Sequence, residues 1–183
     1  MNINEYQNYH ETKAHTSAEF PYNTYLCSIP LDFPGVPLHW HDELELVVIK
    51  SGQGFVSVDF DKRLVHSGDL IIIPPRCLHA IEQDDTFKME YENIIFKPDL
   101  LSSGANDLCM IQYIVPLLDG SLPIEYFLTP ALGSFEALSN CIRQIDLVCA
   151  DQTPGWQLAV KSSLFNFFFL LISERQKKTV STS

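Results

Sequence analysis

The sequence predicts a mainly β fold with α, in which a sandwich or barrel of short strands is followed by an antiparallel pair of helices. Between residues 22 and 96, Pro and Gly divide the chain into short runs rich in β-branched and aromatic residues. After Pro98 the apolar residues recur at steps of three and four, which is typical of helices. The 183 residues, 46% of them hydrophobic, are enough to bury a core in one domain.

Seven strands are expected in the first part of the chain. Their ranges are 22–29, 43–50, 54–60, 63–66, 70–73, 78–82 and 87–96. Hairpin turns are expected at Asp61-Lys62 and at Ser67-Gly68-Asp69, because these residue types tolerate turn dihedrals. The run 43–50 is apolar on both faces, so this strand is expected to be buried on both sides.

Two long helices are expected in the second part. The first starts after Ser134 and ends at Asp151, and the second is capped by Thr153, with Pro154 at its first position, and runs to about Arg175. A short loop makes them antiparallel. The segment 107–115 suggests a short helix and 122–128 a strand.

The second long helix is apolar around most of its circumference. Either it lies buried between its partner helix and the strands, or it also forms a dimer interface. The candidate interface residues are Phe165, Phe168, Phe169 and Ile172. The polar end of the chain, 177–183, is typical of a linker or a frayed end.

Charge and cysteine content exclude several classes of function. The formal net charge of −11 has the wrong sign for a nucleic-acid-binding surface, so this chain alone is not expected to bind DNA. Five cysteines without a CxxC pair, and no signal segment, predict a cytoplasmic protein with reduced thiols that serve as packing residues. The longest apolar run is about nine residues, shorter than the ~20 that cross a bilayer, so no membrane span is expected.

Three histidines and a glutamate form the candidate site. His39, His41 and Glu45 have the same parity, so an extended backbone places them on one side, and His79 follows a strand and the Pro74-Pro75 turn. This donor set suits Fe, Mn, Ni or Zn. Trp40 has the opposite parity and is expected in the core. Other polar residues are not expected to bind a ligand. Asp42 and Glu43 are expected to be solvated carboxylates, and His10, His15 and His66 are expected at the surface.

These residues resemble the two motifs of the cupins. The first is Gly35…His39-x-His41-x3-Glu45-x6-Gly52, and the second is Gly68-x5-Pro74-x-Arg76-x2-His79. All four metal-ligand positions of the family match. The gap after Gly35 is shorter than in the family, Arg76 replaces the usual glycine, and Gln83 stands where asparagine is common. The resemblance implies a cupin-like double-stranded β-helix (jelly-roll) barrel.

Over about residues 19–176 the chain also resembles the sensor domains of AraC-type transcription regulators. The resemblance is carried by the segments 19–22, 37–46 and 68–79 and by the helical hairpin. It implies four regions: an N-terminal arm (1–20), an effector-binding cupin barrel (21–98), a helical dimerisation region (99–176), and the start of a linker to a DNA-binding domain beyond this chain (177–183).

The resemblance implies a homodimeric domain that binds a small effector, often a sugar, without catalysis and without a required cofactor. The expected ligand-binding residues are His39, His41, Glu45, Arg76 and His79, of which all but Arg76 are also candidate metal ligands. Without a metal, they are polar pocket lining or internally hydrogen-bonded histidines. Arg76 either meets an anionic effector or pairs with Glu43 or Glu45. The alternatives are a stand-alone metal-dependent cupin enzyme of the isomerase or dioxygenase type and a metal sensor.

Overall fold

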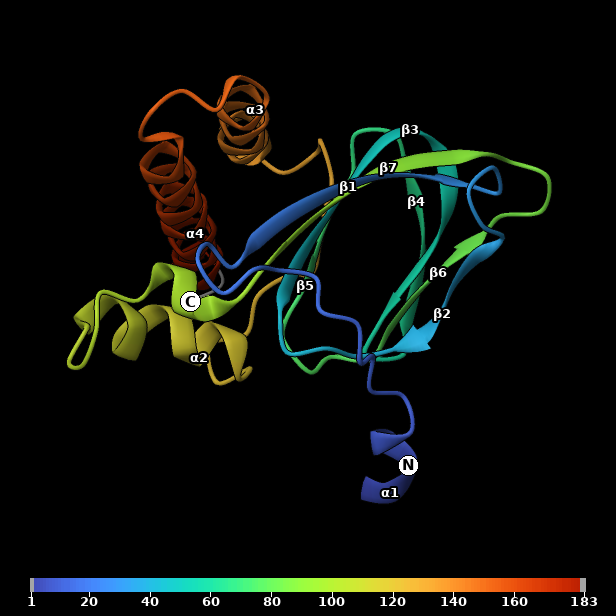
Figure 1. The fold of residues 1–183 in the computed structure, drawn as a ribbon, viewed down its shortest axis with the longest axis horizontal. Helices are drawn as coiled ribbons and strands as arrows, with labels where there is room; N and C mark the ends of the chain where they lie inside the picture. Colours follow the sequence, from blue (N-terminus) through green and yellow to red (C-terminus); the bar gives the residue numbers. More distant parts are fainter. Residues whose placement is uncertain (1, 182–183) are drawn as a thin grey trace. The chain divides into compact units, whose positions relative to one another are not determined.

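The computed structural model describes residues 2–181, with side chains for residues 2–175 (Figure 1). The elements are α1 (Ile3–Gln7), β1 (Tyr22–Ile29), β2 (Gly35–His39), β3 (Leu44–Val58), β4 (Asp61–His66), β5 (Leu70–Ile73), β6 (His79–Gln83), β7 (Met89–Phe96), η1 (Pro98–Leu101), η2 (Met110–Ile114), α2 (Val115–Leu118), β8 (Phe127–Leu128), α3 (Phe135–Asp151) and α4 (Trp156–Ser181). They form two compact units. The first comprises Met1–Pro98 with Tyr126–Thr129, and the second comprises Asp99–Glu125 and the chain from Pro130 onward.

The first unit is an antiparallel β structure organised by the long strand β3. The first half of β3 lies between β7 and β5 in a sheet of order β1-β7-β3-β5-β8, and its second half lies between β4 and β6, with β2 beyond β6. The strand passes from one sheet to the other at Gly52, whose φ of +77° suits glycine. The predicted mainly β fold with α is confirmed.

Apolar side chains from both sheets form a buried core cluster in the first unit. The core cluster consists of Ile29, Val47, Ile49, Val56, Val58, Val65, Ile71, Ile73, Ile81, Met89, Tyr91 and Phe127. On the other face of β3, Leu44 and Leu46 are buried as well. The prediction that this strand is buried on both sides is therefore confirmed, and the same alternation turns Glu45, two residues before Val47, towards the inside.

Strands β1 and β5 have the predicted bounds, but the sequence prediction was wrong at several other places. The runs 43–50 and 54–60 are one bent strand, β2 was not expected, and only Phe127–Leu128 of 122–128 forms a strand. The predicted turn at Asp61-Lys62 lies two residues earlier, at Asp59-Phe60, where both φ angles are positive (49° and 68°) as a two-residue hairpin turn requires. The predicted turn at Ser67-Gly68-Asp69 lies between β4 and β5 as expected.

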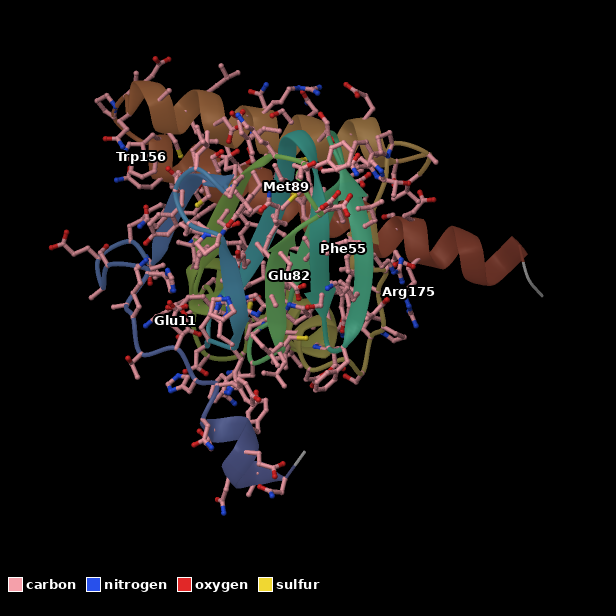
Figure 2. The ribbon with its side chains drawn as sticks, turned by 90° about the vertical axis from the view of Figure 1, so that its right-hand side faces the viewer. Glu11, Phe55, Glu82, Met89, Trp156 and Arg175 are labelled. Atoms are coloured by element: carbon pink, nitrogen blue, oxygen red, sulfur yellow. The ribbon has the colours of Figure 1, made fainter. Side chains whose placement is uncertain are left out.

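In the second unit, α3 and α4 pack against each other and run in opposite directions (Figure 2). Helix α3 ends at Asp151 as predicted. Helix α4 begins at Trp156 rather than at Pro154, because Gly155 has a φ of +89° and interrupts the helical backbone. Its backbone continues to Ser181, beyond the predicted end near Arg175, and Thr182 and Ser183 of the predicted linker lie outside the described residues. A short helical segment, η2 followed by α2, lies where the run 107–115 predicts one.

The apolar surface of α4 is divided between buried and exposed side chains. Val160, Leu164, Phe167, Phe168 and Leu171 are buried within the chain, whereas Phe165 and Phe169 are exposed by 37% and 64%. Phe168 was predicted to lie in a dimer interface. This prediction is wrong, because the Phe168 side chain is buried within the chain itself.

One helical stretch in the described chain, Trp156–Arg175, is long and apolar enough to cross a membrane. The expectation of no membrane span rested on the apolar run of about nine residues within this stretch, Leu164–Ile172, which is broken only by Asn166. The helix meets this criterion by its length and composition only, and core helices of soluble proteins meet it as well.

Candidate functional site

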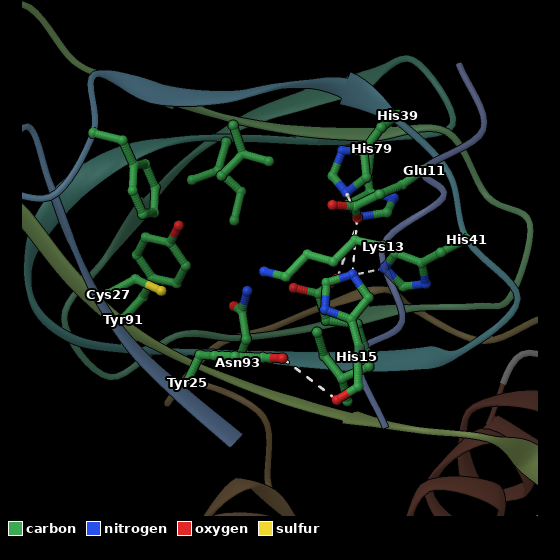
Figure 3. A pocket seen from close by; sticks show the side chains of 15 residues that line it. Glu11, Lys13, His15, Tyr25, Cys27, His39, His41, His79, Tyr91 and Asn93 are labelled. Carbon is green, nitrogen blue, oxygen red and sulfur yellow. Dashed lines mark hydrogen bonds and ion pairs between the residues drawn. The ribbon is translucent and has the colours of Figure 1, made fainter. Parts of the chain in front are cut away.

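The first unit contains a cavity of about 210 Å³ that opens between the strands (Figure 3). Its walls combine polar and apolar side chains from the strands of the barrel and from the N-terminal segment, by which we mean residues 2–16. The lining residues are Glu11, Lys13, His15, Tyr25, Cys27, Phe33, Val36, His39, His41, Glu45, His79, Ile81, Tyr91, Asn93 and Ile95.

The three predicted histidines meet at this cavity. His39 is the last residue of β2 and His79 the first of β6, and they are paired across the two antiparallel strands with ring centroids 4.0 Å apart. His41 lies in the bend between β2 and β3. One ring nitrogen from each histidine lies within 4.8 Å of the other two. The extended backbone expected between His39 and Glu45 is interrupted by a bend at Asp42 and Glu43, yet the side chains converge.

Backbone carbonyl groups fix the orientation of all three rings. The Nδ1 atoms of His39, His41 and His79 lie 2.9, 3.2 and 2.9 Å from the carbonyl oxygens of residues 37, 43 and 77. Since a carbonyl oxygen only accepts hydrogen bonds, each Nδ1 carries the proton. At His39 this leaves the Nε2 lone pair free, which is how metal-binding histidines are oriented by their outer partners. At His41, Nε2 donates to Glu45, so a cation bound there would replace that proton.

Glu45 is the fourth member of the cluster and is almost completely buried. One of its carboxylate oxygens lies 3.1 Å from Nε2 of His41 and 3.3 Å from Nε2 of His79. Burial alone would raise the pKa of Glu45, but the contacts with His41 and His79 hold it well below the usual range. The carboxylate is therefore ionised, and it is a buried anion that needs positive charge beside it.

The histidines differ in protonation. Burial and the nearby charge of His79 lower the pKa of His39 to about 4, so its ring is neutral at physiological pH. Burial would also lower the pKa of His41, but its hydrogen bond to Glu45 and the charges of Glu45 and Glu43 raise it. His79 Nε2 is buried without a partner of hydrogen-bond geometry. A divalent cation would neutralise Glu45 and occupy this orphaned nitrogen, so the four residues fit a metal.

The N-terminal segment adds side chains that the sequence analysis missed. His15 was expected at the surface, but it is buried and its ring lies 5.4 Å from that of His41. Glu11 lies 2.9 Å from His15 and 3.5 Å from His39, and Figure 3 shows Lys13 extending into the cavity. No local pattern marks these residues, because only the path of the chain brings them to the barrel.

Arg76 lies outside the cavity. Its guanidinium is exposed and pairs with Asp42 at 2.8 Å. Of the two alternatives for Arg76, pairing with Glu43 or Glu45 was therefore wrong, and contact with an anionic effector stays a prediction. Asp42 is exposed as predicted, whereas Glu43 is buried and lies 3.7 Å from His41. The structure thus brings together four of the five predicted ligand-binding residues and leaves Arg76 on the surface.

Comparison with known families decides the class of this barrel. The model of the family described as "AraC-like ligand binding domain" matches residues 25–168. The chain belongs to the AraC-like ligand-binding domain family. This assignment does not favour the alternative of a stand-alone cupin enzyme.

Two relatives of this AraC-like domain are HTH-type transcriptional regulators of Bacillus subtilis (strain 168). YdeC is 32% identical over 159 residues, which cover 86% of this chain and 54% of YdeC. YbfI is 28% identical over 72 residues, which cover 39% of this chain and 26% of YbfI. The chain thus spans about half the length of YdeC.

Solved structures of cupins are also similar to parts of the AraC-like domain. A cupin protein from Bacteroides fragilis is 25% identical with a TM-score of 0.41, covering 46% of this chain and 73% of that one. A Cupin 2 conserved barrel domain protein from Salinispora arenicola is 22% identical with a TM-score of 0.38, covering 43% and 65%.

Proposed function

We propose that this chain is the effector-binding domain of a cytoplasmic transcription regulator, and that a small molecule binds in the barrel cavity without being chemically changed. The observation that carries the proposal is the convergence of polar atoms on this enclosed space. Three imidazole groups, Glu45 and the buried amide oxygen of Asn93, which has no hydrogen-bond partner, face it. Binding sites combine such convergent polar groups with apolar walls.

A divalent cation is part of the proposed site. His39, His41, His79 and Glu45 would hold it, and the mixed nitrogen and oxygen donors suit Zn, Ni, Mn or Fe. When bound, the cation supplies a Lewis-acidic centre that attracts oxygen atoms of a small molecule. The protein's own contribution is to fix the three rings through their Nδ1 hydrogen bonds and to keep Glu45 ionised.

The cavity indicates a compact, oxygen-rich effector. Its volume of about 210 Å³ limits the size of the molecule, and its polar groups match hydroxyl or carboxylate oxygens. Lys13, whose ammonium lies 5.1 Å from the centre of the Tyr25 ring, adds a positive charge at the cavity wall. A sugar or a sugar acid has this chemistry.

Thermal unfolding with a panel of neutral sugars, sugar acids and small carboxylic acids tests the proposal. An effector at about 100 times its Kd adds about 2.7 kcal/mol to the free energy of unfolding, which raises Tm by roughly 5–10 °C for a domain of this size. We expect Asn93→Ala to weaken this shift and Asn140→Ala, an exposed change on α3, to leave it intact. Equal shifts in wild type and Asn93→Ala for every active compound would place the effector elsewhere.

We further propose that the chain forms a homodimer through α4, because Phe165 and Phe169 are exposed one turn apart on this helix. Phe169→Asp would place a charge in that interface and is expected to weaken the dimer at least 100-fold. Sedimentation equilibrium measures this. Phe87→Asp, at an exposed aromatic residue of the first unit, is the control. A wild-type monomer, or equal dissociation constants for wild type and Phe169→Asp, would contradict the proposal.

In a longer regulator, α4 would lead to a DNA-binding domain of the helix-turn-helix type, as the names of YdeC and YbfI suggest. The effector would shift the populations of two arrangements of the dimer and thereby change DNA binding.

A further inference from the structure

The N-terminal segment is anchored to the barrel at Trp40. The rings of Tyr6 and His10 stack on the indole, with centroid distances of 4.8 and 4.2 Å. The indole Nε1–H donates to the carbonyl oxygen of Tyr6 at 2.8 Å. Backbone hydrogen bonds continue the attachment, from the Trp40 amide to Tyr9 and from the Glu11 amide to Trp40, both at 2.9 Å.

This anchoring places the Glu11 carboxylate beside the histidine cluster. The Glu11 amide donates a hydrogen bond to the carbonyl oxygen of Trp40, which directly follows His39, so the Glu11 side chain starts close to the His39 ring. One Glu11 oxygen lies 3.5 Å from Nε2 of His39 and 2.9 Å from Nε2 of His15. The Glu11 side chain is 28% exposed, whereas His15 is buried.

Glu11 approaches the cluster from the side of His39, at close to the spacing of two metal ligands. Two neighbouring ligand atoms, each about 2.1 Å from one ion, are about 3.0 Å apart in an octahedral site and about 3.4 Å apart in a tetrahedral one. Glu45 lies 3.1 and 3.3 Å from Nε2 of His41 and His79, and Glu11 lies 3.5 Å from Nε2 of His39. The two carboxylates therefore approach different members of the same histidine cluster at comparable distances.

We propose that Glu11 is a further ligand of the divalent cation, so that metal binding fastens the N-terminal segment onto the barrel. This inference rests on the metal site proposed above and adds a residue from outside the barrel motifs. His15 is a positioning residue, whose Nε2–H holds the Glu11 carboxylate.

Charge balance supports the assignment. Three neutral imidazoles and Glu45 leave a net charge of +1 on a divalent cation, and Glu11 brings the ion and its ligands to neutrality. Beside them, Glu43 next to His41 and Lys13 at the cavity wall carry opposite charges that offset each other. An uncompensated charge in a largely buried site is costly, so the second carboxylate stabilises the bound ion. By linkage, the factor by which the docked segment tightens metal binding equals the factor by which the metal tightens docking.

Limited proteolysis of the purified chain with and without Zn²⁺ tests the inference. Trypsin cuts after Lys13, inside the N-terminal segment, and intact mass shows the loss of residues 1–13. We expect Zn²⁺ to slow this cut at least 10-fold in wild type but not in Glu11→Gln. We also expect the Zn²⁺ affinity of Glu11→Gln, measured by competition with a chelating dye, to be at least 10-fold weaker than that of wild type. Glu19→Gln, at an exposed glutamate close in sequence, is the matched control and should behave as wild type.

Fluorescence of Trp40 gives a second readout that does not depend on a protease. In a Trp156→Phe background Trp40 is the remaining tryptophan, and its stacking on Tyr6 and His10 makes its emission sensitive to docking. Zn²⁺ should change this emission, and Glu11→Gln should abolish the change.

The outcomes separate this inference from the proposals on which it depends. If wild type binds Zn²⁺ but Glu11→Gln has the same affinity and the same protection, the role of Glu11 is overturned and the metal site stands. Faster cleavage with Zn²⁺ would show that the ion displaces Glu11 and would overturn it too. If wild type binds no Zn²⁺, both the metal site and this inference are wrong, while the effector panel still tests the cavity.

Discussion

Zn²⁺ at about 100 times its Kd is expected to raise the free energy of unfolding of the wild-type chain by about 2.7 kcal/mol, and His79→Ala is expected to remove most of this gain. His79 is buried, and its Nε2 atom faces the cluster without a hydrogen-bond partner. Loss of an outer-shell partner of a metal ligand already weakens binding about 10–100-fold, so loss of the ligand itself should weaken it by about 100-fold or more. The remaining gain is then below about 0.4 kcal/mol.

Urea unfolding with Zn²⁺ and with a chelator measures this difference within each protein, so any direct effect of the substitution on stability cancels. His66→Ala is the matched control, because His66 is exposed and lies outside the cavity. An equal Zn²⁺ effect in wild type and His79→Ala would show that the ion binds elsewhere.

Gly52→Ala is expected to lower the free energy of unfolding by about 3 kcal/mol or more. Gly52 has a φ of +77°, and an added Cβ would lie 1.8 Å from the carbonyl oxygen of Lys88. Left-handed strain alone costs of order 1–3 kcal/mol for a residue with a side chain, and a clash with backbone is not relieved by a side-chain rotation. The backbone of β3 or of the segment before β7 must therefore move.

The matched control is Gly133→Ala, because a Cβ there would meet no atom within 4 Å. Surface changes of this kind usually alter stability by less than about 0.5 kcal/mol. Equal urea midpoints for the two variants would mean that the bend of β3 does not depend on glycine. Because β3 carries Glu45 as well as core residues, Gly52→Ala is also expected to weaken Zn²⁺ binding.

The sequence was most informative where a local pattern determines the structure. Runs rich in β-branched and aromatic residues, bounded by turn-forming residues, located β1 and β5. The three- and four-residue spacing of Leu138, Ile142 and Ile145 located α3. The spacing of His39, His41, Glu45 and His79 predicted the candidate cluster, although the backbone between His39 and Glu45 bends where an extended backbone was expected.

The sequence was least informative where contacts between distant segments decide. His15 and Glu11 lie in a polar stretch that suggests a solvated surface, and the stacking and hydrogen bonds of the segment around Trp40 bring them to the cavity. Arg76 occupies a motif position where the cupins usually have glycine, and its φ of +62° and its pairing with Asp42 keep its side chain outside the cavity. At Gly155, a positive φ overrides the capping signal of Thr153-Pro154.

The central claim is that the histidine cluster in the barrel is the ligand site of this AraC-like domain and holds a divalent cation. The most direct measurement is anomalous diffraction at the zinc edge from crystals grown with stoichiometric Zn²⁺. The account predicts one anomalous peak per chain, within coordination distance of the Nε2 atoms of His39, His41 and His79. The absence of a peak at this cluster, with zinc bound only at exposed histidines such as His66, would contradict the proposed site.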